Sequence, residues 1–125
     1  MDRNEFIKIL NEYYSFSPPV RYSLAIDFDG TLCNSSYPKL GEEIAPICNF
    51  IRSIMDLDFN LILYTCRHGD NLDDAIVWCA EHDIYFDYVN ENPKDRVLLW
   101  GDCAKLSYDL LIDDKTFNFN IKDFS

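Results

Sequence analysis

Two aspartates, Asp27 and Asp29, directly follow an apolar run and offer the clearest chemistry in this sequence. Residues 24–26 predict a buried strand, and Gly30 ends the pattern immediately after the second acid. Because residues two apart on a strand share a face, both carboxylates can point to one place. Two negative charges that close disfavour each other's ionisation unless a cation lies between them. The spacing therefore indicates a site for a hard divalent cation, with Mg²⁺ as the expected cofactor.

An Asp-Gly pair is also common in ordinary turns, so this run alone is equally compatible with a plain strand end. Further polar residues favour the site, because Thr65 follows a second apolar strand and Asp113 and Asp114 follow a third. Strands that alternate with helices predict a parallel sheet with helices on both faces. Ligands of such sheets bind beyond the carboxyl ends of the strands, where these polar groups are expected to meet.

The elements that would position these residues follow from the apolar periodicity. Strands are predicted over residues 21–27, 61–64, 85–89 and 108–112, and helices over 2–14, from Glu42 to about 57, and 72–80. Residues 90–104 are predicted as a loop that folds over the site, and the tail has no clear assignment. The chain divides into an amino-terminal helix and linker, 1–19, and one domain, 20–125. The helix is expected to pack on the edge of the domain, with a partner-binding arm as the alternative.

The bulk composition narrows the function classes. The chain has 125 residues, which suits one domain, and its net charge of −11 opposes binding to nucleic acid and to anionic membranes. It has no apolar run long enough to cross a bilayer and no signal-peptide pattern, so we expect a cytoplasmic protein. Its five cysteines, Cys33, Cys48, Cys66, Cys79 and Cys103, form no CxxC pair and are expected as reduced thiols rather than zinc ligands.

Four stretches together resemble the motifs of the haloacid dehalogenase-like superfamily of phosphohydrolases. They are, in order, Asp27-Phe-Asp-Gly-Thr-Leu32, Thr65, Lys105 and Ile112-Asp-Asp114, and the resemblance covers about residues 21–116. It implies an α/β fold, a three-layer α/β/α Rossmann-like parallel sheet. The gaps between motifs, 30–64 and 66–104, are too short for a large cap domain, so a capless member is expected, covered only by a flap near 31–40 and the 90–104 loop.

The resemblance also implies roles for single residues. Asp27 would be the nucleophile that forms an aspartyl-phosphate, and Asp29 the general acid and then the general base. Mg²⁺ would be bound by the Asp27 side chain, the Asp29 carbonyl and Asp113, while Asp114 would contact the ion through water or pair with Lys105. Whether Asp113 or Asp114 binds the ion directly stays open. Thr65 and Lys105 would contact the phosphoryl oxygens, together with the backbone N–H groups of Phe28 and Asp29.

Three assignments near the site have alternatives. Lys94 could take the role given to Lys105, although it lies farther upstream of the acid pair. Arg67 is interpreted either as a surface loop residue or as a residue that binds a second anionic group of the substrate. Cys66 adjoins the expected substrate site, and like Cys33 it is interpreted as a packing residue rather than a nucleophile.

The expected function is therefore a Mg²⁺-dependent phosphomonoester hydrolase. Its partner would be a phosphorylated substrate, either a small molecule or an exposed phosphate on a larger one. One alternative is a phosphatase that processes nucleic-acid ends, against which the acidic charge counts. Another is a non-catalytic module that binds phosphate or a partner. The substrate, the oligomeric state, and the roles of residues 1–19 and of the tail are left open by the sequence.

Overall fold

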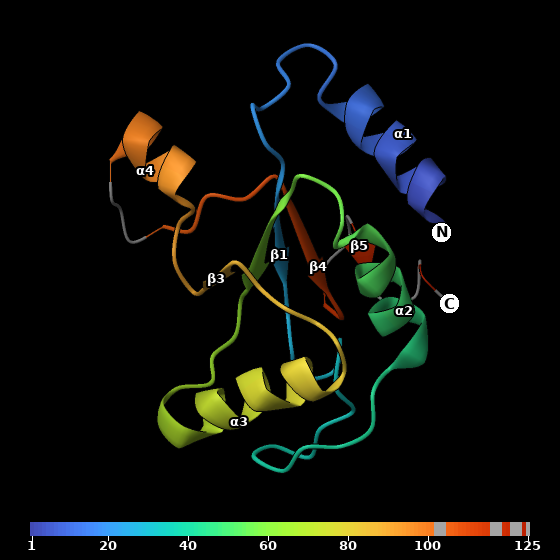
Figure 1. Cartoon of the computed structure of the whole chain (residues 1–125), viewed down its shortest axis with the longest axis vertical. Coiled ribbons are helices and arrows are strands. Elements are labelled where there is room, and N and C mark those ends of the chain that lie inside the picture. Colours follow the sequence, from blue (N-terminus) through green and yellow to red (C-terminus); the bar gives the residue numbers. More distant parts are fainter. Residues whose placement is uncertain (102–104, 116–118, 121–123, 125) are drawn as a thin grey trace.

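A parallel β-sheet forms the centre of the protein in the computed structural model, which describes residues 1–101, 105–115, 119–120 and 124. The strands are β1 (Ser23–Ile26), β2 (Asn60–Leu63), β3 (Tyr88–Val89), β4 (Leu110–Asp113) and β5 (Phe119–Asn120). In the described part of the chain their order is β3-β2-β1-β4-β5, and every pair is parallel (Figure 1). The predicted α/β fold with a parallel sheet is confirmed.

The two inner strands explain why apolar runs mark this sheet. All four residues of β1 and all four of β2 are buried, as expected for strands covered on both faces. The register pairs Ile26 with Leu63 on one side and with Ile112 on the other. The strands β1, β2 and β4 therefore end side by side at one edge of the sheet.

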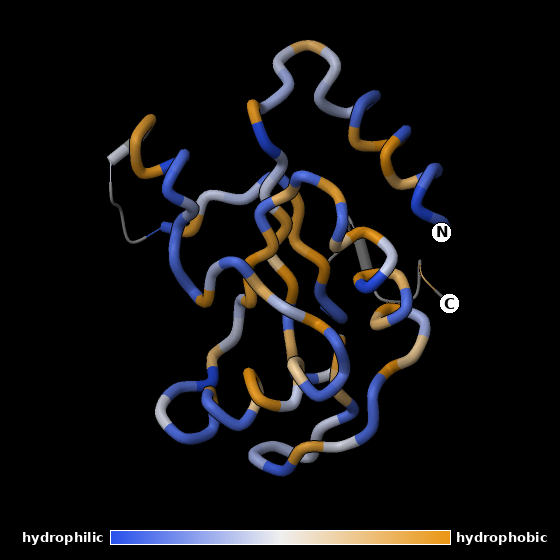
Figure 2. Tube along the Cα trace, viewed as in Figure 1, coloured by the Kyte–Doolittle hydropathy of each residue, from blue (hydrophilic) through white to orange (hydrophobic). Residues whose placement is uncertain are grey.

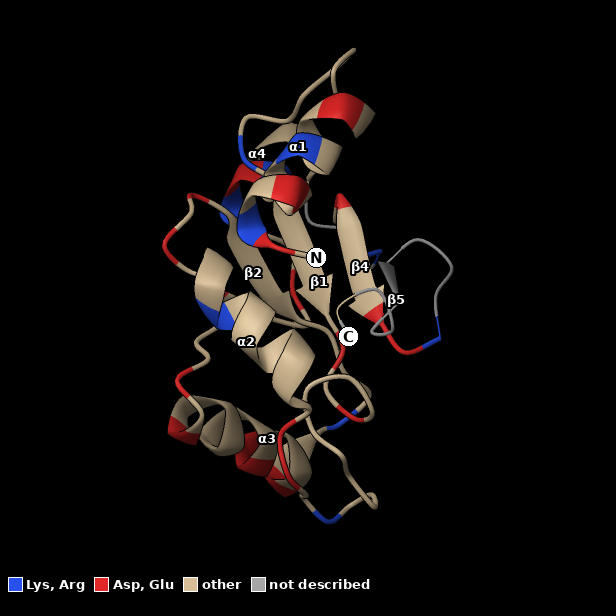
Figure 3. Ribbon diagram, turned by 90° about the vertical axis from the view of Figure 1, so that its right-hand side faces the viewer, with Lys and Arg blue, Asp and Glu red and all other residues tan. Residues whose placement is uncertain are grey.

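Helices flank this sheet on opposite sides (Figures 1 and 3). One side carries α1 (Arg3–Tyr13) and α2 (Ala45–Ile54), and the other side carries the short helix α4 (Lys94–Trp100). The helix α3 (Gly69–Glu81) lies beyond the carboxyl ends of β1 and β2. No helix in the described ranges is both long enough and apolar enough to span a bilayer.

The core joins the amino-terminal helix to the rest of the domain. Phe6 and Leu10 of α1 are fully buried, and the Phe6 ring meets Phe50 of α2 edge-on at 4.9 Å between centroids. Figure 2 shows that apolar residues make up much of the central strands and recur along both helices. The predicted packing of this helix on the domain is confirmed, and Tyr13 at the end of the helix is 75% exposed.

The prediction of a loop over residues 90–104 is wrong, because this stretch contains α4. The sequence of α4 shows no helical spacing of apolar residues, because the residue that it buries deeply is the charged Arg96, whereas Leu98 and Leu99 are exposed. The helix also does not fold over the acidic edge, since it lies at the opposite end of the strands. Cys103, in the same stretch, is outside the described residues. Strand β5 was not assigned from the sequence.

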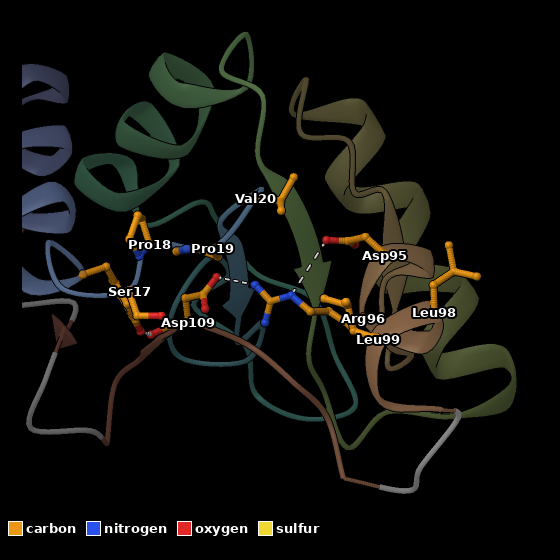
Figure 4. Close-up of a pocket in the computed structure, with 10 residues that line it drawn as sticks. Ser17, Pro18, Pro19, Val20, Asp95, Arg96, Leu98, Leu99 and Asp109 are labelled. Carbon is orange, nitrogen blue, oxygen red and sulfur yellow. Dashed lines mark hydrogen bonds and ion pairs between the residues drawn. The ribbon is translucent and has the colours of Figure 1, made fainter.

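Arg96 fastens α4 to the amino ends of the strands (Figure 4). Its guanidinium donates to Asp109 Oδ2 at 2.6 Å and to the carbonyl of Arg21 at 3.1 Å. A cavity of about 550 Å³ beside this contact is lined mostly by apolar groups of the 17–20 linker and of α4. Its charged groups, Arg96, Asp95 and Asp109, are already joined in ion pairs, so this cavity offers no catalytic chemistry.

Candidate functional site

Three carboxylates converge at the carboxyl edge of the sheet. Asp27 directly follows β1, and its N–H donates to the carbonyl of Ile112 at 3.0 Å, which places it beside the end of β4. Asp27, Asp113 and Asp114 each offer an oxygen within 4.8 Å of the other two, and all three are half-buried. Figure 3 shows the acidic segments that follow β1 and β4 at this edge. The predicted convergence of these distant acids is confirmed.

Burial and mutual repulsion raise the pKa values of Asp27 and Asp114 in the acidic cluster. Burial raises the pKa of Asp27 to about 6, with further contributions from Asp113 and Asp114, although a hydrogen bond from Thr31 opposes the change. Burial also raises the pKa of Asp114, as does its hydrogen bond with Asp113. Three converging carboxylates whose ionisation is disfavoured form a donor set that suits a hard divalent cation. These residues therefore fit Mg²⁺.

The acidic cluster predicts that Asp27→Asn stabilises the metal-free protein at neutral pH. The Asp27 pKa rises from 3.8 to about 6 on folding, so its ionisation costs stability above pH 6, and this cost disappears below pH 4. Allowing for partial solvent screening, we expect a gain of about 1–2 kcal/mol. Urea unfolding in EDTA at pH 8 and at pH 4 measures it. A variant less stable than wild type at pH 8 would contradict the repulsion.

Gly30 lets the chain pass close to the acidic cluster. Its φ is +81°, and a β-carbon at this position would lie 2.6 Å from Asp114 Oδ2. The left-handed conformation and the contact therefore both require glycine. In the sequence Gly30 ends the strand pattern and belongs to the Asp27–Leu32 motif, whereas its contact with Asp114 is made by the fold.

We expect Gly30→Ala to weaken Mg²⁺ binding about tenfold, since the new methyl group displaces the Asp114 carboxylate. Gly101→Ala is the matched control, because Gly101 has a φ of +78° but no atom of the described residues within 4 Å of its β-carbon position. Both variants pay a similar backbone cost of about 1 kcal/mol. The measurement is the increase in melting temperature that Mg²⁺ produces in each. Equal increases in the two variants would show that Gly30 does not support the acidic cluster.

Thr65, at the end of β2, is clamped by Asn90. The Thr65 N–H donates to Asn90 Oδ1 at 2.8 Å, and Asn90 Nδ2 donates to the Thr65 carbonyl at 2.9 Å. The Thr65 hydroxyl accepts from the N–H of Arg67 at 3.1 Å, so its own hydrogen can still be donated. No spacing or motif in the sequence indicates Asn90, whose φ of +51° directly after β3 is one that asparagine tolerates better than most residues.

Among the described residues the acidic cluster consists of Asp27, Asp113 and Asp114, and the Asp29 side chain is not part of it. It accepts from Arg67 Nε at 2.9 Å and from Arg67 Nη2 at 2.7 Å. Burial raises the Asp29 pKa, but the hydrogen bonds from Arg67 and Ser35 outweigh it and leave the pKa below its ordinary value. Asp29 is thus an ionised partner of Arg67, and a metal contact through its backbone carbonyl stays a prediction.

Arg67 is among the most buried side chains of the protein, with 2% exposure, so its interpretation as a surface residue is wrong. Its guanidinium carbon lies 5.1 Å from the ring centre of Phe28 and 5.0 Å from that of Tyr37. Besides Asp29, it donates to the carbonyl oxygens of Pro38 and Asn71. Arg67 therefore ties the flap near 31–40 to the start of α3, rather than presenting donors to a ligand.

The remaining predicted residues of the site are Lys105, Lys94, Cys66 and Phe28. Lys105 is exposed, and its carbonyl accepts from Asn92 Nδ2 at 3.1 Å. Lys94 begins α4, whose next residues bind the amino ends of the strands, so it lies away from this edge. Cys66 is exposed, which contradicts its interpretation as a packing residue, whereas Cys33 is buried as expected. Phe28 is fully buried against Trp78, so only its backbone can face a substrate.

The fold and the site together define an α/β protein with a parallel sheet and an acidic cluster at its carboxyl edge. A solved structure of a conserved protein from Bacteroides thetaiotaomicron is similar, with 33% sequence identity and a TM-score of 0.68. The match covers 79% of this chain and 80% of the Bacteroides chain, so this chain belongs to the same protein family. Comparison with protein-family models and with curated proteins gives no match.

Proposed function

We propose that the protein is a Mg²⁺-dependent phosphomonoester hydrolase of the haloacid dehalogenase-like type. The observation that carries this proposal is the convergence of Asp27, Asp113 and Asp114 within 4.8 Å. Those three carboxylates would hold Mg²⁺, which when bound offsets the charge between the anionic nucleophile and the phosphate. The acids come from strands that are far apart in the sequence, as the motif resemblance requires.

Asp27 is the proposed nucleophile. Its carboxylate attacks phosphorus, the bond to the leaving alcohol breaks, and an aspartyl-phosphate forms. The Thr65 hydroxyl donates to a phosphoryl oxygen, and the Lys105 ammonium offsets charge that spreads over these oxygens in the transition state. Water then attacks the aspartyl-phosphate and releases inorganic phosphate.

Asp29 is the proposed general acid and general base. Its ion pair with Arg67 favours the base role over the acid role. As an ionised carboxylate it can take a proton from the attacking water. To protonate the leaving alcohol it must first acquire a proton, which its pairing with Arg67 disfavours. This one observation favours a second candidate, a non-catalytic module that binds phosphate or a partner at the same edge.

The proposed enzyme is a three-layer α/β/α protein without a cap domain. Residues 27–44, between β1 and α2, form only turns and isolated bridges, and the link from β2 to α3 spans residues 64–68. Neither link holds a folded unit that could close over the acidic cluster. The proposed site therefore opens to substrates of varied size beyond the flap near 31–40.

A panel of phosphate esters tests the proposal. We expect hydrolysis with Mg²⁺ and none with EDTA, because without the cation the acidic cluster repels the phosphate. A 3′-phosphorylated oligonucleotide in the panel tests the end-processing alternative, and the net charge of −11 predicts poor turnover of it. Mg²⁺ binding without turnover of any ester would favour the non-catalytic module over the hydrolase.

A further inference from the structure

Two exposed tyrosine rings lie beside each other, one from Tyr64, which directly follows β2, and one from Tyr108, which lies two residues before the start of β4. Tyr64 and Tyr108 keep 42% and 39% of their surface exposed. Their ring centroids are 6.2 Å apart, with an angle of 44° between the planes. Together they form an aromatic pair from segments far apart in the sequence, and Tyr64 directly precedes Thr65.

Tyr64 of the aromatic pair lies beside Asp27 at the carboxyl edge of the sheet. Each is the first residue after its strand, and the last residues of those strands, Leu63 and Ile26, are paired neighbours. The Tyr64 N–H donates to the carbonyl of Ile26 at 2.9 Å, so the two strands are still joined at this point.

Two asparagines of one loop fix the segments that carry the two tyrosines. Asn92 Nδ2 donates to the Lys105 carbonyl, and Asn92 Oδ1 accepts from the N–H of Ser107. Asn90, two residues earlier, clamps the Thr65 peptide through two hydrogen bonds. One short loop thus fixes both Thr65 and the segment that carries Tyr108. The aromatic pair is a built surface next to a residue proposed to bind phosphate.

We propose that the aromatic pair is a subsite for a flat aromatic ring in the leaving group of the substrate. This inference rests on the proposed function and names its substrate class, phosphomonoesters that carry such a ring, as nucleoside monophosphates do. Exposed tyrosine rings can stack on the face of any base, and this stacking requires no particular pattern of hydrogen bonds. The phosphate at Asp27 and Thr65 and the ring on Tyr64 would be bound by adjacent residues of two neighbouring strands.

The test compares two substrates that differ only by the base, AMP and ribose 5-phosphate. We expect kcat/KM for AMP to exceed that for ribose 5-phosphate by about tenfold, as one stacked base contributes. Tyr64→Ala is expected to remove most of this preference, and Tyr64→Phe to keep it, because phenylalanine retains the ring. Tyr13→Ala is the matched control, since Tyr13 is an exposed tyrosine on α1, and it should leave the preference unchanged.

If the wild-type ratio of kcat/KM for AMP to that for ribose 5-phosphate is near one, or if a high ratio survives in Tyr64→Ala, the subsite is overturned while the hydrolase proposal stays intact. Phosphotyrosine and phosphoserine form a second pair of substrates, and a Tyr64-dependent preference there alone would assign the ring to a phosphorylated peptide side chain. If no ester is hydrolysed, the hydrolase proposal fails. Calorimetry with the Mg²⁺-loaded protein then measures the affinities for AMP and ribose 5-phosphate. Binding of AMP about tenfold tighter would support the subsite, and equal affinities would overturn it.

Discussion

Asp27→Asn is expected to lower kcat for phosphate-ester hydrolysis by at least about 1,000-fold, because the proposed aspartyl-phosphate cannot form on an amide. The position is well suited to this test, since asparagine keeps the shape of the side chain and can still accept the hydrogen bond from Thr31. The variant also relieves repulsion within the acidic cluster. It should therefore fold at least as well as the wild-type protein, and lost activity cannot be attributed to unfolding.

The matched control for this variant is Asp58→Asn. Asp58 is a well exposed aspartate whose ion pair with Arg21 lies on the surface, so its removal should change kcat less than twofold. Steady-state kinetics with saturating Mg²⁺ measures both variants. Wild-type activity in Asp27→Asn would rule out Asp27 as the nucleophile, whatever role the acidic cluster has in binding metal.

Arg67→Ala is expected to destabilise the protein by about 2–4 kcal/mol. The substitution leaves the half-exposed Asp29 carboxylate without its partner and removes the donors to the Pro38 and Asn71 carbonyls. It also empties the space between the rings of Phe28 and Tyr37. Urea unfolding measures the loss.

Arg3→Ala is the control for this prediction. Arg3 pairs with Asp56 at 2.9 Å, yet both side chains are largely exposed, so its loss should cost less than about 1 kcal/mol. Arg67→Lys separates charge from geometry, because an ammonium cannot donate in the planar fork that binds Asp29. We expect the lysine variant to recover less than half of the lost stability. Equal costs for Arg3→Ala and Arg67→Ala would show that burial adds nothing to this pair.

The sequence was most informative where periodicity reports burial. The apolar run before Asp27 and the one before Thr65 are β1 and β2, whose residues are buried on both faces. The alternation of such runs with amphipathic helices predicted the parallel sheet, and the parallel sheet predicted that Asp27 and Asp113 meet. This inference needed no side-chain geometry, since the carboxyl ends of neighbouring parallel strands always share an edge.

The sequence was misleading where burial involves charge. Helix α4 is fastened by Arg96 and exposes its leucines, so it has no apolar stripe from which to predict it. Arg67 stands in a polar loop and looks like a surface residue, yet it is buried because Asp29, two carbonyls and two aromatic rings surround it. The partners of Arg67 come from three separate segments, 28–29, 37–38 and Asn71, and local sequence patterns carry no information about them.

By itself, the sequence determined the class of fold and the edge at which its acids collect, because both depend on which residues avoid water. Only the tertiary structure decided which acids share one point and which acid pairs with Arg67. It also placed Asn90 behind Thr65 and Tyr108 beside Tyr64. These are contacts between distant segments, set by packing and hydrogen-bond geometry at the ångström scale, which residue type and spacing do not encode.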